Sequence, residues 1–103
     1  MEIEFKELTP TSLYVKSEGR LDMDSAGDFG SKIKDYIINH NIAEVTLDFT
    51  DITFISSFGL KIVLEIYQTV KEDPGIVRII NANDQIKNSF HMVGFDKFVK
   101  VNE

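Results

Sequence analysis

Two adjacent serines, Ser56 and Ser57, stand between an apolar run that ends at Ile55 and a run with helical spacing that follows. A serine at the start of a helix is a good N-cap, worth about 1 kcal/mol over alanine. The same position has free backbone N–H groups and the positive end of the helix dipole, which together stabilise an anion such as a phosphate. Position alone therefore leaves two interpretations open, a helix cap or a phosphorylation switch.

Nucleophilic catalysis by these serines is disfavoured, because a serine nucleophile needs a base beside it. The chain has only two histidines, His40 and His91, and His40 falls on the apolar stripe of a predicted helix. The serines also lack the preceding glycine of a nucleophile elbow. We therefore expect no catalytic residue and no enzyme activity.

Metal and nucleotide sites are equally disfavoured by the residue pattern. There is no cysteine, and the alternating acids Asp22, Asp24 and Asp28 run into a helix instead of closing a calcium loop. These acids suit a loop and the first turn of a helix, or contact with a partner. The six glycines are dispersed and form no phosphate-binding loop. The sequence thus predicts no metal and no cofactor.

Composition predicts one small globular domain over residues 1–103, with 43% hydrophobic and 27% charged residues. The formal net charge of -6 argues against direct binding of nucleic acid, which requires a basic face. The N-terminus shows no continuous apolar segment of a signal peptide, and no run approaches the roughly 18 apolar residues of a membrane helix. We expect a cytoplasmic protein that does not act on a membrane.

The spacing of apolar residues predicts the element order β β α β α β α β. A short connection containing Pro10 makes the first two strands an antiparallel hairpin. The predicted elements are strands at 2–8 and 13–19, a helix from Asp24 or Ser25 to about 40, a strand at 45–49, a loop at 50–56, a helix at 57–71 stopped by Asp73-Pro74-Gly75, a strand at 76–80, a helix from Asn83 or Asp84 to Gly94, and a strand at 98–101.

Alternation of strands and helices in the middle of the chain predicts an α/β fold: a mixed, mostly parallel sheet with an N-terminal hairpin and about three helices packed against it. The nearly continuous apolar stretch at 76–80 predicts a strand covered on both faces. Ile62 and Ile66 widen the apolar stripe of the helix after Ser57, which predicts burial on more than one side.

Three segments in chain order resemble the STAS domain family, which includes anti-sigma factor antagonists. The segment LDFTDITFISSFGL, residues 47–60, is similar to the family signature around its phosphorylated serine. GRLD at 19–22 and MVGFDKFVKV at 92–101 resemble two further family segments. The resemblance covers nearly the whole chain and implies the STAS fold.

The resemblance also implies a function and places the phosphorylated serine on Ser57. In this family an unphosphorylated antagonist binds an anti-sigma factor that is also a serine kinase, which releases a sigma factor for transcription. Phosphorylation breaks the complex, and a PP2C-type phosphatase resets it. The resemblance implies partner switching by a monomer that carries out no reaction itself.

Two departures from the family pattern fall beside Ser57. The family's Asp before the phosphorylated serine is Ser56 here, and the Ser or Thr after it is Phe58. Ser56 is thus a rival acceptor or the helix cap. Phe58 is either an exposed apolar anchor or a side chain turned onto the sheet. The partner-binding residues implied are Asp22, Asp24, Thr53, Ser56, Phe58 and Gly59.

Two alternatives stay open at this point. The departures at Ser56 and Phe58 favour a STAS scaffold used without phosphorylation, as an interaction subunit of a transporter or signalling assembly. A small-ligand or nucleotide sensor is the other alternative, with the helix that begins at Ser57 holding a phosphate group. The sequence offers no base-recognition motif for it.

Overall fold

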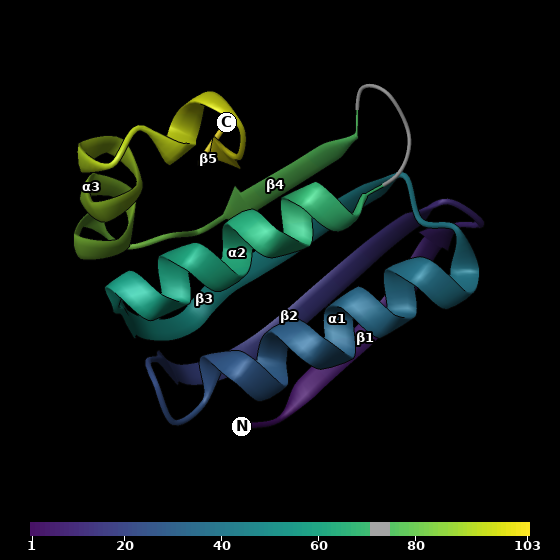
Figure 1. Ribbon diagram of the computed structural model, residues 1–103, viewed down its shortest axis with the longest axis horizontal. Helices are drawn as coiled ribbons and strands as arrows, with labels where there is room; N and C mark the ends of the chain where they lie inside the picture. The colour runs from purple at the N-terminus through teal and green to yellow at the C-terminus, as the bar shows by residue number, and fades with distance from the viewer. Residues whose placement is uncertain (71–74) are drawn as a thin grey trace.

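The computed structural model describes residues 1–70 and 75–103 and has a five-stranded mixed sheet with helices on one face (Figure 1). Its elements are β1 (Ile3–Thr9), β2 (Ser12–Leu21), α1 (Ala26–His40), β3 (Glu44–Ile55), α2 (Ser57–Thr69), β4 (Ile76–Ile80), α3 (Asp84–Met92), a short 3-10 helix (Phe95–Lys97) and β5 (Lys100–Val101). The strand order is β1-β2-β3-β4-β5. β1 is antiparallel to β2, and every other neighbouring pair is parallel. The predicted fold class is confirmed.

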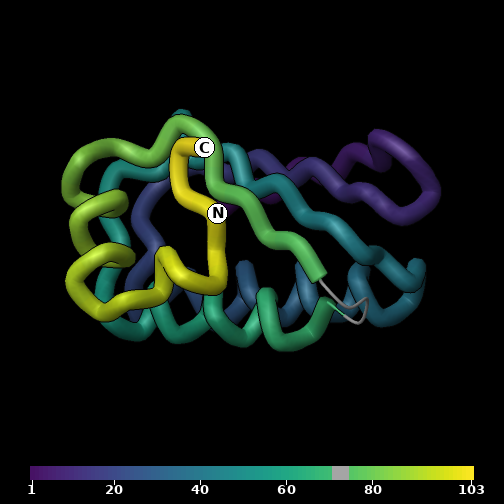
Figure 2. Tube along the Cα trace, turned by 90° about the horizontal axis from the view of Figure 1, so that it is seen from above, coloured from purple at the N-terminus to yellow at the C-terminus, as the bar shows by residue number. Residues whose placement is uncertain are grey.

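The helices α1 and α2 lie side by side across one face of the sheet, and Figure 2 shows them together below it. α3 stands at the end of the sheet where β3 and β4 finish. The core fills the space between the sheet and these helices, where the largest fully buried side chains include Phe29, Phe49 and Phe90. The opposite sheet face carries no helix in the described part of the chain.

β4 is covered on one face only, so the prediction of a strand buried on both faces is wrong. Val77 and Ile79 are fully buried, whereas Ile76, Arg78 and Ile80 are half-buried. The reason is the layer arrangement, since Ile76, Arg78 and Ile80, which alternate with the two buried residues, point to the helix-free face. The nearly continuous apolar sequence of β4 therefore led to a prediction of more burial than the strand has.

β3 continues to Ile55, so the predicted loop at 50–56 is also wrong. Polar Thr50, Asp51 and Thr53 gave this stretch the composition of a loop. The segment is extended because it pairs with the end of β2, through to Leu21 opposite Ile55. β2 is correspondingly longer than predicted and ends at Leu21. After Glu18 the alternation of buried and exposed side chains stops, and register shifts after Lys16 in the pairing with β3 let the strand continue.

The helix boundaries follow local signals. Asn41, in the left-handed conformation with φ 52°, ends α1, and Gly94 with φ 76° follows α3. The Asn83 side chain caps α3 by accepting the Ile86 N–H at 3.0 Å. α2 is buried against α1 as well as the sheet, as predicted, because Ile62 packs onto Gly30. The predicted stop at 73–75 falls largely on residues 71–74, outside the described residues.

Candidate functional site

The two serines at the start of α2 have different roles in the structure. Ser56 is the N-cap, with φ -90° and ψ 174°, and its Oγ accepts the Gly59 N–H at 3.1 Å. Ser57 is the first helical residue and is exposed. Within the described residues no hydrogen-bond partner holds the Ser57 hydroxyl. The cap is thus Ser56, and the hydroxyl that faces solvent freely is that of Ser57.

The backbone at this junction is tied to the end of β2. The Ser56 N–H donates to the Leu21 carbonyl oxygen at 2.9 Å. Gly59 lies against the same carbonyl, because a Cβ on Gly59 would be 2.5 Å from the Leu21 oxygen and 2.7 Å from Ile55 Cγ1. Gly59 is buried, so its part in the site is to let α2 approach β2, with no side chain to offer a partner.

The acids predicted to contact a partner lie in the loop directly after Leu21, beside the serines. Asp22 Oδ1 accepts the Asp24 N–H at 3.0 Å and the Ser25 hydroxyl at 3.2 Å. The Asp24 N–H, helped by Ser25 and by Arg20, holds the pKa of Asp22 below its ordinary value. Asp22 therefore stays ionised and orders the loop, while Asp24 is exposed. Asp22 thus directly follows the residue whose carbonyl accepts the Ser56 N–H, and Asp24 lies two residues further along the same loop.

The remaining predicted residues divide between the surface and the interior. Thr53 is exposed on β3, and its hydroxyl donates to the Gly19 carbonyl at 3.3 Å. Phe58 is half-buried and packs against the core, closer to the inward interpretation than to an exposed anchor. Met23 was missed by sequence reasoning, although its side chain is 79% exposed between Asp22 and Asp24.

Side chains from α3 hold the other edge of the same junction, and sequence reasoning missed these as well. Gln85 contacts both backbone groups of Ile55: its Oε1 accepts the N–H at 3.1 Å and its Nε2 donates to the carbonyl at 3.1 Å. Asn83 Nδ2 donates to the Thr53 carbonyl at 3.1 Å. No short-range signal points to these contacts, because the partners are thirty residues apart in sequence.

The helix-free face of the sheet carries a buried carboxylate, Asp48, with 7% exposure. It accepts the Tyr14 hydroxyl, the Thr50 N–H at 3.0 Å and hydroxyl at 2.6 Å, and Asn81 Nδ2 at 3.2 Å. Burial alone would raise the pKa of Asp48, but the bonds from Thr50, Tyr14 and Asn81 outweigh it and lower the pKa to about 2. The bond to Asp48 raises the pKa of Tyr14 to about 12.

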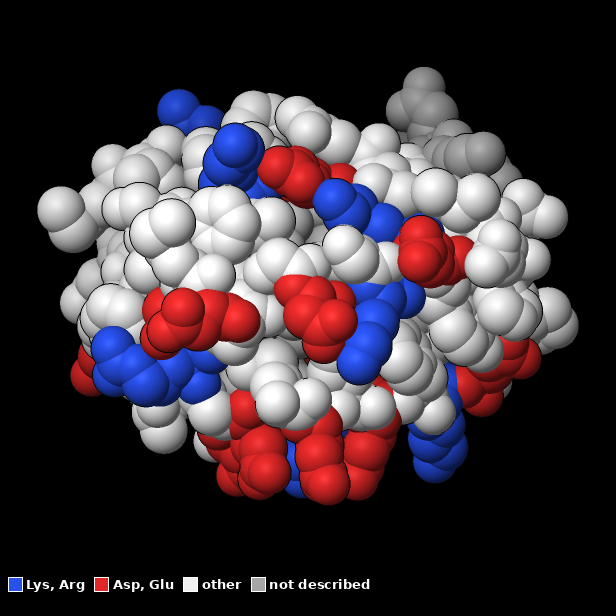
Figure 3. All heavy atoms as spheres, turned by 60° about the horizontal axis from the view of Figure 1, so that its bottom comes forward, with Lys and Arg blue, Asp and Glu red and all other residues white. Residues whose placement is uncertain are grey.

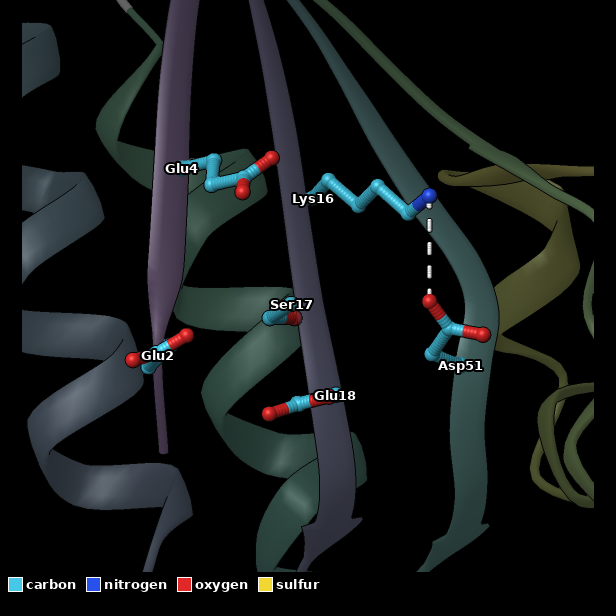
Figure 4. A pocket seen from close by; sticks show the side chains of 6 residues that line it. All are labelled: Glu2, Glu4, Lys16, Ser17, Glu18 and Asp51. Carbon is cyan, nitrogen blue, oxygen red and sulfur yellow. Dashed lines mark ion pairs between the residues drawn. The ribbon is translucent and has the colours of Figure 1, made fainter.

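Acidic side chains dominate part of the surface, and Figure 3 shows several gathered along the lower edge of its view. A surface hollow on the helix-free face is lined mainly by acids, Glu2, Glu4, Glu18 and Asp51, with Lys16 3.7 Å from Asp51 (Figure 4). None of the predicted site residues lines it. In residues 1–70 and 75–103 no group of three or more His, Asp or Glu side chains is placed to hold a metal ion. No helix within the same ranges is long and apolar enough to cross a membrane.

Comparison with known proteins gives weak sequence similarity and strong structural similarity. A Thermotoga maritima protein with the provisional name of anti-sigma factor antagonist is 21% identical over 81 residues, which is 79% of this chain and 72% of that protein. An anti-sigma factor antagonist from Mycobacterium paratuberculosis superposes with a TM-score of 0.80 at 21% identity, over 97% of this chain and 85% of that one. The Bacillus cell fate determinant SpoIIAA in its phosphorylated form gives 0.71 at 18%, over 97% and 90%.

At these identities the solved structures establish the fold alone. The sequence profile of the STAS domain matches residues 2–103, almost the entire chain. The element order, the mixed sheet and the serine at the start of α2 agree with that match. The chain therefore belongs to the STAS domain family.

Proposed function

We propose that this protein is an anti-sigma factor antagonist that acts by binding and is switched by phosphorylation of Ser57. The observation that carries the proposal is that Ser56 caps α2 while the Ser57 side chain is exposed. Ser56 Oγ is engaged by the Gly59 N–H, so a modification there would remove the cap. Ser57 is exposed at the first position of α2 and can be modified without disturbing the helix. The relatives named as anti-sigma factor antagonists support the choice of partner.

Phosphorylation at Ser57 changes the charge of the site more than its shape. A phosphoserine carries about -1.5 to -2 charges at neutral pH, and the start of a helix tolerates such an anion. Asp22 and Asp24 already make the adjacent rim negative. A partner that approaches this rim with basic groups would bind the unphosphorylated form. A new dianion inside that interface would have to be desolvated, or would be repelled by acidic groups there. A tenfold loss of affinity corresponds to only about 1.4 kcal/mol of binding free energy, so one phosphate is enough to weaken the complex strongly.

The kinase in this proposal is the anti-sigma factor itself, and a PP2C-type phosphatase restores the unmodified serine. Phosphopeptide mapping of residues 51–70 after incubation with the cognate kinase tests the position of the phosphate. We expect phosphate on Ser57 and none on Ser56. Unmodified serines with an active kinase, or phosphate on Ser56 alone, would refute the switch as proposed.

Binding measurements with substituted proteins test the consequence for the partner. Ser57→Asp should abolish binding of the anti-sigma factor, and Ser57→Ala should bind and stay bound in the presence of ATP. Ser56→Thr is the matched control, because threonine is also an N-cap and leaves Ser57 intact. Equal binding by Ser57→Asp and Ser57→Ala would contradict the proposal.

The runner-up is an interaction subunit that uses the same surface without phosphorylation. Two observations favour it: Ser56 supplies no acid beside the acceptor, and Phe58 is packed inward instead of standing beside Ser57. In that case Ser57→Asp and Ser57→Ala would each leave partner binding unchanged. Phosphopeptide mapping on protein from the native cell distinguishes the two.

A further inference from the structure

Among residues 1–70 and 75–103, no strand pairs with the end of β3 on the side of β4. β3 and β4 pair from Glu44 to Asp48, where β4 reaches Ile80 and ends. From Phe49 to Ile55, β3 is therefore without β4 beside it. Ile55 is buried, with 2% exposure, so backbone groups left unpaired there would be costly.

The direction of the backbone N–H and C=O groups alternates along β3, and this decides which of them need a partner on the side away from β2. Successive residues of a strand direct their N–H and C=O groups to opposite sides, toward one neighbouring strand and then the other. The Ser56 N–H points to β2, where it bonds to the Leu21 carbonyl at 2.9 Å. The N–H and C=O of Ile55 thus point away from β2, to the side where α3 stands.

The carboxamide of Gln85 occupies this side and pairs with both groups of Ile55, at 3.1 Å each. An amide side chain has one acceptor and a donor group in one plane, the same pair that a strand backbone presents. The Gln85 side chain is itself oriented, because its Nε2 also donates to Ser89 Oγ at 3.0 Å. Asn83 adds a donor to the Thr53 carbonyl, two residues earlier on the same side of β3.

We propose that Gln85 is a positioning residue for Ser57: by taking the place of a strand beside Ile55, it fixes the backbone from which the exposed serine projects. Ile55 is two residues before Ser57, and Ser56 between them is held from the β2 side. The junction is therefore clamped on both sides. The consequence for partner binding rests on the proposed function, whereas the effect on the backbone does not.

Amide hydrogen exchange of the labelled protein measures the effect on the backbone. Gln85→Met keeps the length of the side chain and removes both hydrogen bonds. We expect exchange at Ile55 to become at least about tenfold faster, while Val45 and Leu47 at the other end of β3 are unchanged. Lys87→Met is the matched control, since it places the same side chain at an exposed position of α3 and leaves the pairing of Gln85 to Ile55 intact. Unchanged protection of Ile55, or equally faster exchange throughout the sheet, would overturn the proposal.

A second variant separates positioning from general packing. In Gln85→Glu the ionised carboxylate has no donor for the Ile55 carbonyl, but the protonated acid restores a donor and an acceptor. The hydrogen-bond partners of Gln85 in the described chain are Ile55 and Ser89, neither of which titrates. The amide chemical shifts of Ile55 and Ser57 should therefore return toward the wild-type values as the pH falls below about 4.3. Shifts that stay displaced at low pH would count against the proposal.

Calorimetric titration with the anti-sigma factor then links the clamp to Ser57. Gln85→Met should weaken binding roughly tenfold, because binding must then fix backbone that the native protein already holds in place. If the wild-type protein binds no anti-sigma factor, the proposed function fails and the exchange data alone decide the role of Gln85. If both proteins bind equally while Ile55 exchanges faster in the variant, Gln85 does not position Ser57.

Discussion

Replacement of Gly59 by alanine tests the close approach that puts Ser57 beside the acidic loop. The added Cβ would lie 2.5 Å from the Leu21 carbonyl oxygen, 2.7 Å from Ile55 Cγ1 and 3.2 Å from Leu21 Cβ. Ordinary contact distances are near 3.5 to 4.0 Å, so the start of α2 must move outward by about 1 Å. The obstacle is backbone, which does not rotate away as a side chain can.

The magnitude follows from three terms. Overpacking a well-packed site costs about 1 to 3 kcal/mol. The same Leu21 oxygen accepts the Ser56 N–H, and losing that bond costs about 1 kcal/mol more. Alanine has a higher helix propensity than glycine, which stabilises the folded state by about 1 kcal/mol. We therefore expect Gly59→Ala to lower the free energy of unfolding by about 2 kcal/mol.

Two other glycines of the described chain provide the matched series for urea denaturation. Gly27 has no heavy atom within 4 Å of an added Cβ, so Gly27→Ala should be neutral or stabilising by up to about 1 kcal/mol. Gly30 faces the side chain of Ile62, which can shift. The change in unfolding free energy for Gly30→Ala should therefore lie between those for Gly27→Ala and Gly59→Ala. A midpoint for Gly59→Ala equal to that of the wild type would refute the reasoning. A loss of stability in Gly27→Ala equal to that in Gly59→Ala would also refute it.

The remaining predictions concern the buried carboxylate and the cap. The folded-state pKa of Asp48, about 2, lies below its ordinary 3.8, so its contribution is fully present above pH 4 and is lost as the pH falls through 2. Asp48→Asn should lower the unfolding free energy at pH 7 by roughly 2 kcal/mol and flatten its dependence on pH between 4 and 2, as measured by urea denaturation at each pH; an unchanged pH profile would contradict this. Ser56→Ala should cost about 1 kcal/mol in thermal unfolding and Ser57→Ala less than about 0.5 kcal/mol, and the reverse order would assign the cap to Ser57.

The parts of the fold that sequence predicted correctly are those fixed by neighbours along the chain. Phe29, Ile33 and Ile37 recur at helical spacing and are all buried on α1. Asn83 caps α3 from the position that its residue type and the following apolar pattern indicate. Capping and amphipathic spacing act over three to four residues, so a single sequence contains what is needed to find them.

The errors occurred where distant residues decide the structure. The stretch from Thr50 to Ile55 is polar enough to suggest a loop, yet pairing with β2, some thirty residues earlier, holds it extended. β4 has the composition of a strand covered on both faces, but no helix of the described residues crosses to the second face to cover it. The contact of Gln85 with Ile55 depends on where α3 docks, which no local pattern encodes.

The departure at Ser56 from the family's acid has a structural explanation that leaves Ser57 available. Aspartate and serine are comparable N-caps, because either side chain can accept an N–H from the first turn of the helix. Ser56 does so through Gly59, which preserves the geometry that an acid would give. The replacement therefore changes the charge beside Ser57 without moving it. With one fewer negative charge adjacent, a phosphate on Ser57 is repelled less within its own loop, and the acids that remain at the rim are Asp22 and Asp24. Under the proposed function, discrimination against the phosphorylated form then comes mainly from that rim and from the partner.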